Sequence, residues 1–375
     1  MSLLIRGLGT AVPDCQLPQA DAEQVGRILC TDRPSQAEML NVLYRQTGIA
    51  TRYIVIDRAV VDDVLHHTRH SESVFLARSD RPEGPTTGQR MAEYSQRVLP
   101  LALRAAQRAL DESAIAPERL THLVTVSCTG FAAPGYDIGL FKALGLRPTV
   151  QRTHVGFMGC HGALNGLRVA RAFTAADPHA CVLLVAVELC SLHYSYGWNT
   201  KRLVANALFA DGAAAVVGTA GGGSGTAGGT DTAGPAWICR ANGSCLFPDS
   251  EDAMTWTIGD AGFEMTLSTR VPNLIGKHLR PWLESWLDTQ GLSLERVRSW
   301  AVHPGGPRIL TDVAESLGLP QASMDVARQV LRECGNMSSP TVLFLLQRLR
   351  TSGAELPCVA LGFGPGLVVE AALFA

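Results

Sequence analysis

The sequence predicts an α/β fold in which helices cover both faces of a largely buried sheet. Residues 181–189, CVLLVAVEL, form a continuous apolar run of the kind found in strands that are covered on both sides. Segments with strand and helix periodicity alternate along nearly the whole chain. Hydrophobic residues make up 46% of the 375 positions and charged residues 18%, which indicates a globular protein with a large core.

The first half of the chain divides into predicted elements as follows. The short apolar run at the N-terminus predicts a first strand, and the irregular, histidine-containing residues 66–83 predict a solvated loop or lid. Residues 88–112 have helical spacing, although Pro100 is expected to kink or break the helix. The remaining elements are a strand at 122–128, a helix at 134–144 and central strands at 181–189 and 213–218.

The second half repeats the same alternation after a low-complexity stretch. Residues 218–235 are too poor in apolar side chains to pack, so we expect an exposed loop that separates an N-terminal half, 1–220, from a C-terminal half, 235–375. A duplicated α/β body is therefore predicted. Its second half contains a strand at 300–303, helices at 306–319 and 338–353, and a closing hairpin at 359–374 around a glycine turn.

A cysteine in the middle of the chain has the setting of a nucleophile. Residues 149–176 read as an extended segment, a glycine-flanked turn and a helix that begins at about Cys160. Free amide groups and the helix dipole favour an anion there, so we expect the thiolate to form more easily than at the usual pKa of about 8.5. Gly156, Gly159 and Gly162 permit a sharp turn. The alternative is a structural cysteine in a tight turn.

Two later residues could serve as partners of that thiol. His303 follows a predicted strand and precedes a Pro-Gly turn, and Asn336 lies just before a predicted helix. Taken singly, the histidine could be a buried core residue and the asparagine a helix cap. Together with Cys160 they supply a nucleophile, a cation for the thiolate and two donors for a developing oxyanion. Since Asn is neutral, it can also stabilise an enolate without repelling a carboxylate.

Four motifs make the chain similar to a known family. GFMGC around Cys160, HPGGP after His303, GNMSS around Asn336 and GFGPG at 362–366 resemble the signatures of type III polyketide synthases, the chalcone-synthase-like family, in its bacterial form. Similarity at 127–146 and 207–217 extends the match over most of the chain from about residue 100. The resemblance implies a thiolase-like five-layered αβαβα fold with duplicated halves, a homodimer, and no cofactor or metal.

The family resemblance also implies a reaction. A starter acyl group passes from acyl-CoA to Cys160, and malonyl-CoA is decarboxylated beside His303 and Asn336. The enolate condenses with the thioester, and after repeated rounds the poly-β-keto chain cyclises to a pyrone or phenolic product. Small-molecule CoA thioesters are thus the implied substrates.

Further site residues follow from matching positions in the family. Phe209 matches an aromatic gatekeeper between the CoA tunnel and the cavity, and Met265 replaces its usual aromatic partner. Cys128, Cys190 and His193 match cavity-lining positions, and Ser338 matches a small residue beside the asparagine. The turn that would shape the cavity floor consists of Gly362, Phe363, Gly364, Pro365 and Gly366. Strand-end packing, a helix cap and a tight hairpin are the respective alternatives.

The chain departs from the plant enzymes at two places. Basic residues for the CoA phosphates are not evident, and Arg45 and Arg52 are the nearest candidates. Ala133 stands where the plant enzymes carry a methionine that reaches into the cavity of the partner subunit.

Other classes of protein fit less well. In a β-ketoacyl carrier-protein synthase III, the motifs HQAN and GFGGG would stand where this chain has HPGGP and GFGPG. In a papain-like hydrolase, the cysteine would not follow GFMG. A non-catalytic scaffold would not need the three residues. A formal charge of −2, without a basic tract among aromatics, argues against nucleic acid. The interrupted apolar N-terminus predicts no membrane span, and ten scattered cysteines predict a reducing cytoplasm.

Overall fold

The computed structural model describes residues 2–221 and 236–375, and these contain a nine-stranded mixed sheet. Its strand order is β11-β12-β13-β8-β1-β7-β6-β4-β5. The strands are β1 (Ser2–Ala11), β4 (His122–Ser127), β5 (Gln151–Gly156), β6 (Cys181–Leu189), β7 (Asp211–Gly221), β8 (Ile238–Leu246), β11 (Ser299–Val302), β12 (Cys358–Gly364) and β13 (Val368–Phe374). The buried strands predicted at 122–128, 181–189 and 213–218 are therefore present.

Two half-sheets meet edge to edge in the centre of the molecule. The N-terminal half supplies β5-β4-β6-β7-β1 and the C-terminal half supplies β11-β12-β13-β8, joined where Leu3 pairs with Cys239 and Leu4 with Ile238. Of the loop predicted at 218–235, residues 218–221 instead extend β7, because all four pair with β1 and residues 218 and 219 also pair with β6. The rest of that prediction, 222–235, lies outside the described residues.

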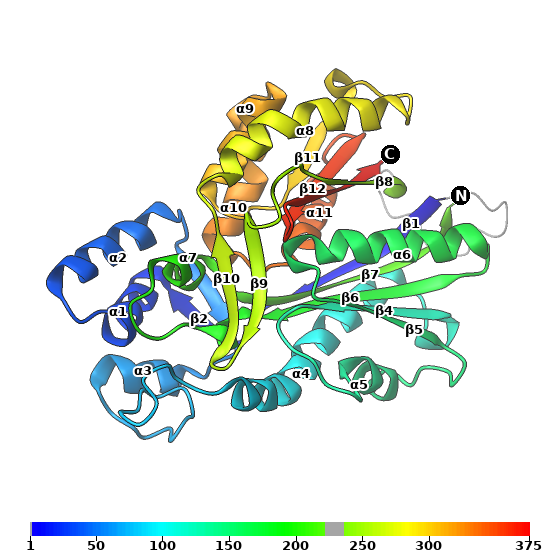
Figure 1. Ribbon diagram of the computed structural model, residues 1–375. Helices are drawn as coiled ribbons and strands as arrows, with labels where there is room; N and C mark the ends of the chain where they lie inside the picture. The colour runs from blue at the N-terminus through cyan, green and yellow to red at the C-terminus, as the bar shows by residue number, and fades with distance from the viewer. Residues whose placement is uncertain (1, 222–235) are drawn as a thin grey trace.

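Helices form three layers around the two half-sheets (Figure 1). α4 (Thr87–Ser113) and α5 (Tyr136–Ala143) cover the outer face of the N-terminal half-sheet. α6 (Gly162–Ala176) and α11 (Thr341–Thr351) lie between the halves and contact strands of both. α8 (Val271–Asp288) and α9 (Pro307–Leu317) cover the far side of the C-terminal half-sheet, where Trp286 packs against Gly243 of β8. This is the expected αβαβα layering.

Pro100 does not break the helix that contains it. α4 runs without interruption through Pro100, which is exposed. The opposite face of α4 buries Val98 before the proline and Leu101 and Ala102 after it against the N-terminal half-sheet. Because that burial stabilises both sides of the proline, the loss of one backbone hydrogen bond is tolerated and the predicted break is wrong.

Smaller elements surround the sheet on one side. β2 (Cys15–Pro18) pairs with β3 (Thr51–Ile54), and α1 (Gln19–Cys30), α2 (Pro34–Gln46), α3 (Arg58–His66) and α7 (Thr200–Leu208) pack nearby. β9 (Met254–Gly259) and β10 (Gly262–Leu267) form a hairpin that crosses in front of the large sheet (Figure 1). α10 (Asp325–Cys334) precedes α11.

The segment predicted as a loop at 66–83 contains no helix beyond the last residue of α3 and no named strand. Its first part is ordered by the buried Asp63, whose carboxylate accepts hydrogen bonds from Thr68 Oγ1, the amide of His70, and both the amide and Oγ of Ser71. Among the described helices, none combines the length and apolarity needed to span a membrane.

Candidate active site

Three residues that are distant in the sequence line one small cavity. Cys160 lies in the turn η2 (Gly159–His161) between β5 and α6, His303 follows β11, and Asn336 lies between α10 and α11. All three border the same cavity of ≈ 20 Å³, together with Phe209 and Met265. The structure thus brings together the three residues that the sequence singled out, and it places both predicted gatekeeper positions beside them.

The turn that carries Cys160 depends on residues with left-handed backbone conformations. Gly159 has φ +75°, and a Cβ there would overlap with the ring of Pro365. Phe157 also has positive φ, at 58°, which is uncommon for an aromatic residue. The conformation directs the thiol inward, and Cys160 is only 7% exposed, two residues before α6 begins at Gly162. The predicted position at a helix N-terminus is confirmed.

The burial of Cys160 opposes the predicted ease of thiolate formation. Burial raises the pKa of Cys160 to about 11, and hydrogen bonds from Ser338 and Asn336 to the sulfur oppose that rise only in part. The negative charge of Glu188 adds to it. Removal from water therefore favours the neutral thiol, from which a base has to take the proton before the sulfur reacts.

His303 borders the same cavity as the thiol. It is 1% exposed, and burial together with the nearby His161 lowers the pKa of His303 to about 3. Neither ring nitrogen has a hydrogen-bond partner among the described residues. A neutral imidazole has one acceptor nitrogen and one donor nitrogen. His303 can therefore take a proton at one nitrogen and donate a hydrogen bond from the other.

The amide of Asn336 is oriented by its own backbone neighbourhood. Its Oδ1 accepts a hydrogen bond of 2.8 Å from the amide of Ser338, so Nδ2 is left to donate toward the cavity. Its backbone pairs with the segment around Phe209, since its N–H donates to Leu208 O and its carbonyl accepts from Ala210 N. α11 begins only at Thr341, so neither Asn336 nor Ser338 caps that helix.

A second small space adjoins the thiol on another side. Its volume is ≈ 30 Å³, and Cys128, Cys190, Ser338 and Pro365 line it together with Cys160. The Cys128 thiol donates to Glu188 Oε1, at 3.0 Å, so it belongs to a buried polar network. Glu188 was not singled out from the sequence, although an acidic residue inside the apolar run 181–189 is a visible signal.

The glycine turn at 362–366 packs against the nucleophile turn. Phe363 lines the cavity that holds the three residues, and Pro365 lines the second space. A Cβ at Gly364 would overlap with the ring of His161, and one at Gly362 would lie 3.1 Å from its Cβ. Gly366 has φ +102° at the end of the turn. Glycine is therefore required where the β12 backbone approaches η2.

His193 faces a different region from Cys160. Its Nε2 donates to the carbonyl of Thr129 and its Nδ1 accepts from the amide of Phe263, on whose ring it stacks. Burial lowers the pKa of His193 to about 3, so it is neutral at pH 7. It borders a larger cavity that also contacts Phe209 and Met265.

Arg52 is buried and already hydrogen-bonded within the protein, so it is not free to contact CoA phosphates. It is 4% exposed, and its guanidinium donates to the side chain of Gln19 and to the carbonyls of Asn206, Ala207 and Phe209. A cation at the C-terminus of a helix complements the helix dipole. Arg52 therefore fixes the end of α7 that carries Phe209, which corrects the sequence interpretation.

Arg45 and Lys201 are basic residues with exposed side chains. Arg45 is exposed on α2, as a phosphate contact would require. Lys201 of α7 is also exposed and borders the cavity of Cys160, His303 and Asn336. The sequence did not single out Lys201, because its position relative to that cavity depends on the fold.

His161 gives the protein a measurable pH dependence. Its Nε2 has no partner among the described residues, and burial lowers its pKa to about 4. Because the unfolded chain binds this proton below about pH 6.5, stability is lost as pH falls through that value. We expect His161→Phe to relieve about 2 kcal/mol of that loss between pH 7.5 and 5.

Urea unfolding of both proteins at each pH tests this expectation. Comparing the two at the same pH cancels the contributions of the other buried groups. An unfolding free energy that falls equally in wild type and variant would show that His161 is protonated in the folded protein.

Comparisons with known proteins show which family the chain belongs to. The model for the N-terminal domain of chalcone and stilbene synthases matches residues 2–222, and the model for their C-terminal domain matches 240–375. The alpha-pyrone synthesis polyketide synthase-like Pks18 of Mycobacterium tuberculosis is 31% identical, over 99% of this chain and 90% of its own. The 1,3,6,8-tetrahydroxynaphthalene synthase of Streptomyces peucetius subsp. caesius is 32% identical, over 98% and 91%.

Solved structures give the same result. The crystal structure of PKS-I from the brown alga Ectocarpus siliculosus superposes with a TM-score of 0.87 at 30% identity, covering 100% of this chain and 98% of its own. The type III polyketide synthase domain of Steely1 from Dictyostelium superposes with a TM-score of 0.86 at 26% identity, covering 100% and 99%. These matches confirm the thiolase-like α/β fold. The chain belongs to the chalcone and stilbene synthase family and is a type III polyketide synthase, an acyltransferase.

Proposed function

We propose that Cys160 carries the acyl chain, that His303 transfers protons, and that His303 and Asn336 together stabilise negative charge. His303 takes the thiol proton as the Cys160 sulfur attacks the carbonyl of a starter acyl-CoA. The carbon–sulfur bond to CoA then breaks, and the CoA sulfur takes the proton from His303. The single observation that supports these roles is the shared cavity, in which His303 has two free nitrogens and Asn336 has its amide group directed by Ser338.

Extension of the acyl chain uses the hydrogen-bond donors of His303 and Asn336. When malonyl-CoA loses CO2, the electrons of the broken carbon–carbon bond move to the thioester oxygen, and His303 and Asn336 donate hydrogen bonds to that enolate. The enolate carbon attacks the acyl carbonyl on Cys160, the sulfur leaves, and a β-ketoacyl-CoA forms. Repeated rounds and cyclisation give a pyrone or phenolic product, as the names of the two curated relatives suggest.

The surroundings of the cavity support further parts of the proposal. CoA enters beside Lys201 of α7 and keeps its phosphates near solvent, where Arg45 is a second contact. Acyl-CoA and malonyl-CoA are the substrates, and no further cofactor takes part. The halves 1–220 and 235–375 supply Cys160 and the His303–Asn336 pair, respectively. A homodimer in the cytoplasm is the assembly that we infer. Exposed apolar residues near β5, Phe131 and Met158, are consistent with a covered surface.

The experiment that tests this function is incubation of the purified enzyme with a panel of acyl-CoA starters and malonyl-CoA. We expect release of CO2 and free CoA and the appearance of polyketides whose masses equal a starter plus whole ketide units. Hydrolysis of acyl-CoA to the free acid without any carbon–carbon bond formation would contradict the proposal.

A further inference from the structure

A cavity of ≈ 500 Å³ lies on the other side of Phe209 and Met265 from the three proposed catalytic residues. These two side chains line this cavity and both small spaces around Cys160. Cys190 and Trp256 likewise border both this cavity and the second small space. The apolar cavity, as we call it, is therefore separated from the thiol by a few side chains and not by backbone layers.

The spaces next to Cys160 are too small for more than the reacting atoms. Their volumes of ≈ 20 and ≈ 30 Å³ correspond to about one or two water molecules each. Trp256 contributes to this filling, since it pairs with Met265 across the β9–β10 hairpin and its Nε1 donates to Cys128 O. The apolar cavity adjoins both spaces, and its volume is typical of small-molecule sites, so it has room for an acyl chain of more than a few atoms on Cys160.

The lining of the apolar cavity selects against polar ligands. Much of it is aliphatic or aromatic: Leu17, Ala22, Val25, Leu29, Ile54, Ile56, Val60, Val61, Val64 and Phe75. Several of its polar side chains are already paired within the protein. All donors of Arg52 and both nitrogens of His193 are engaged, Asn206 bonds the backbone of Ser195, and Arg202 pairs with Glu264 at 2.6 Å. A polar ligand would have to break these bonds or stay unpaired.

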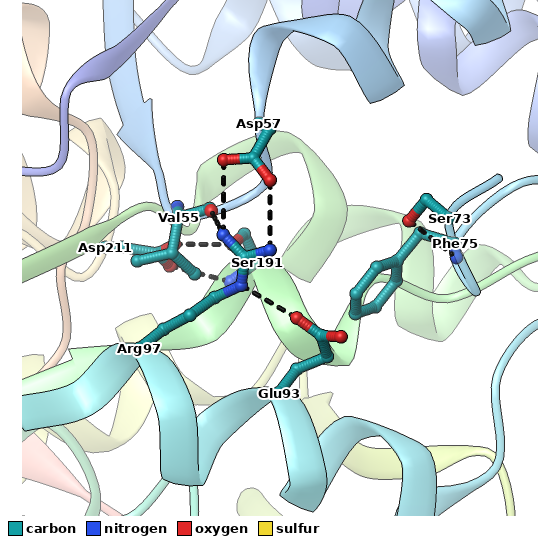
Figure 2. Close-up of polar contacts among 8 residues, drawn as sticks. All are labelled: Val55, Asp57, Ser73, Phe75, Glu93, Arg97, Ser191 and Asp211. Carbon is teal, nitrogen blue, oxygen red and sulfur yellow. Dashed lines mark hydrogen bonds and ion pairs between the residues drawn. The ribbon is translucent and has the colours of Figure 1, made fainter. Parts of the chain in front are cut away.

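The wall of the apolar cavity formed by β3 and the start of α3 is fixed in place. Figure 2 shows Arg97 of α4 donating to the carbonyl of Val55 and to both carboxylate oxygens of Asp57. On the other side, Asp211 accepts from the amide of Val55 and from the amide and hydroxyl of Ser191. The segment between Ile54 and Val60 is thereby tied to α4 and to the start of β7, so the cavity does not depend on a bound ligand for its shape.

We propose that the apolar cavity holds the aliphatic tail of the starter acyl group while its carbonyl reacts at Cys160. The tail passes between Phe209 and Met265, where the unbranched thioether can change rotamer to open the way. This inference rests on the proposed function, because it needs an acyl group at Cys160. Each buried methylene is expected to raise kcat/KM roughly fourfold until the cavity is full.

A larger side chain in the apolar cavity tests directly whether the cavity holds the starter tail. Val61 is 5% exposed on α3 and lines the cavity, so Val61→Phe should shorten it without touching Cys160. In wild type we expect kcat/KM to rise from acetyl- to hexanoyl- to dodecanoyl-CoA. In Val61→Phe we expect at least a tenfold loss for dodecanoyl-CoA and an unchanged value for acetyl-CoA. The matched control is Val42→Phe, at a 51% exposed position of α2.

Three results would overturn the inference. They are a wild-type preference for acetyl-CoA over longer chains, an equal loss for every starter in Val61→Phe, and shorter products from all starters with unchanged starter use. The last would assign the cavity to the growing polyketide. Val25→Phe on α1, at a partly exposed lining position, repeats the test if Val61→Phe does not fold. Failure of the proposed function itself would look different, because no starter would then acylate Cys160.

Discussion

Replacing Cys160 with alanine is expected to abolish polyketide formation while malonyl-CoA continues to lose CO2. The thiol is needed to hold the acyl chain, whereas the enolate oxygen needs only the donors of His303 and Asn336. The substitution removes one sulfur from a nearly filled cavity and leaves both partners in place. Assays of CO2 release and of product mass on the same sample separate the two activities.

The control for that experiment is Cys245→Ala, which removes a half-buried thiol of β8 that does not line either space around Cys160. It should retain full polyketide output. Full output from the Cys160→Ala protein would refute the proposed acyl carrier, and loss of output from both variants would point to a stability effect.

Replacing Asn336 with aspartate is expected to reduce decarboxylation and condensation by about 10²–10³. The two side chains have the same shape, and the oxygen that accepts from Ser338 is retained. The carboxylate, however, donates no hydrogen bond and places negative charge beside the developing enolate. Transfer of the starter to Cys160 should be affected less, because it forms no enolate. Rates of CO2 release and of starter acylation, measured separately, check both parts.

Asn242→Asp is a matched control, because Asn242 lies on β8, accepts from Arg171 Nε and lines neither space near the thiol. It should leave both rates unchanged. If Asn336→Asp decarboxylates malonyl-CoA at the wild-type rate, the enolate is stabilised by other groups and the role proposed for Asn336 is wrong.

The sequence predicted the features that depend on local apolar periodicity or on a recognisable motif. The run at 181–189 is β6, and the strand, helices and hairpin of the second half are present within a few residues of their predicted bounds. The convergence of Cys160, His303 and Asn336 was expected because their motifs resemble those of a known family, and the shared cavity agrees with that expectation.

Features that depend on tertiary burial were not predictable in the same way. The position of Cys160 at the N-terminus of a helix suggested a lowered pKa, but burial of the thiol raises its pKa instead. Arg52 was placed near CoA because it is basic, and the fold instead buries it against the carbonyls at the end of α7. Pro100 suggested a break, but packing of the opposite face maintains α4. In each case the outcome depends on burial by residues that are far away in the sequence.

Mass analysis of the acylated protein tests the central claim most directly. Wild-type enzyme is incubated with one acyl-CoA starter without malonyl-CoA, quenched in acid and digested, and the acyl group is located by peptide sequencing. We predict a single acyl group on the peptide that contains GFMGC, at Cys160, and none there when His303 is replaced by alanine. An acyl group on another of the ten cysteines, or acylation of Cys160 that does not respond to His303, would contradict the account.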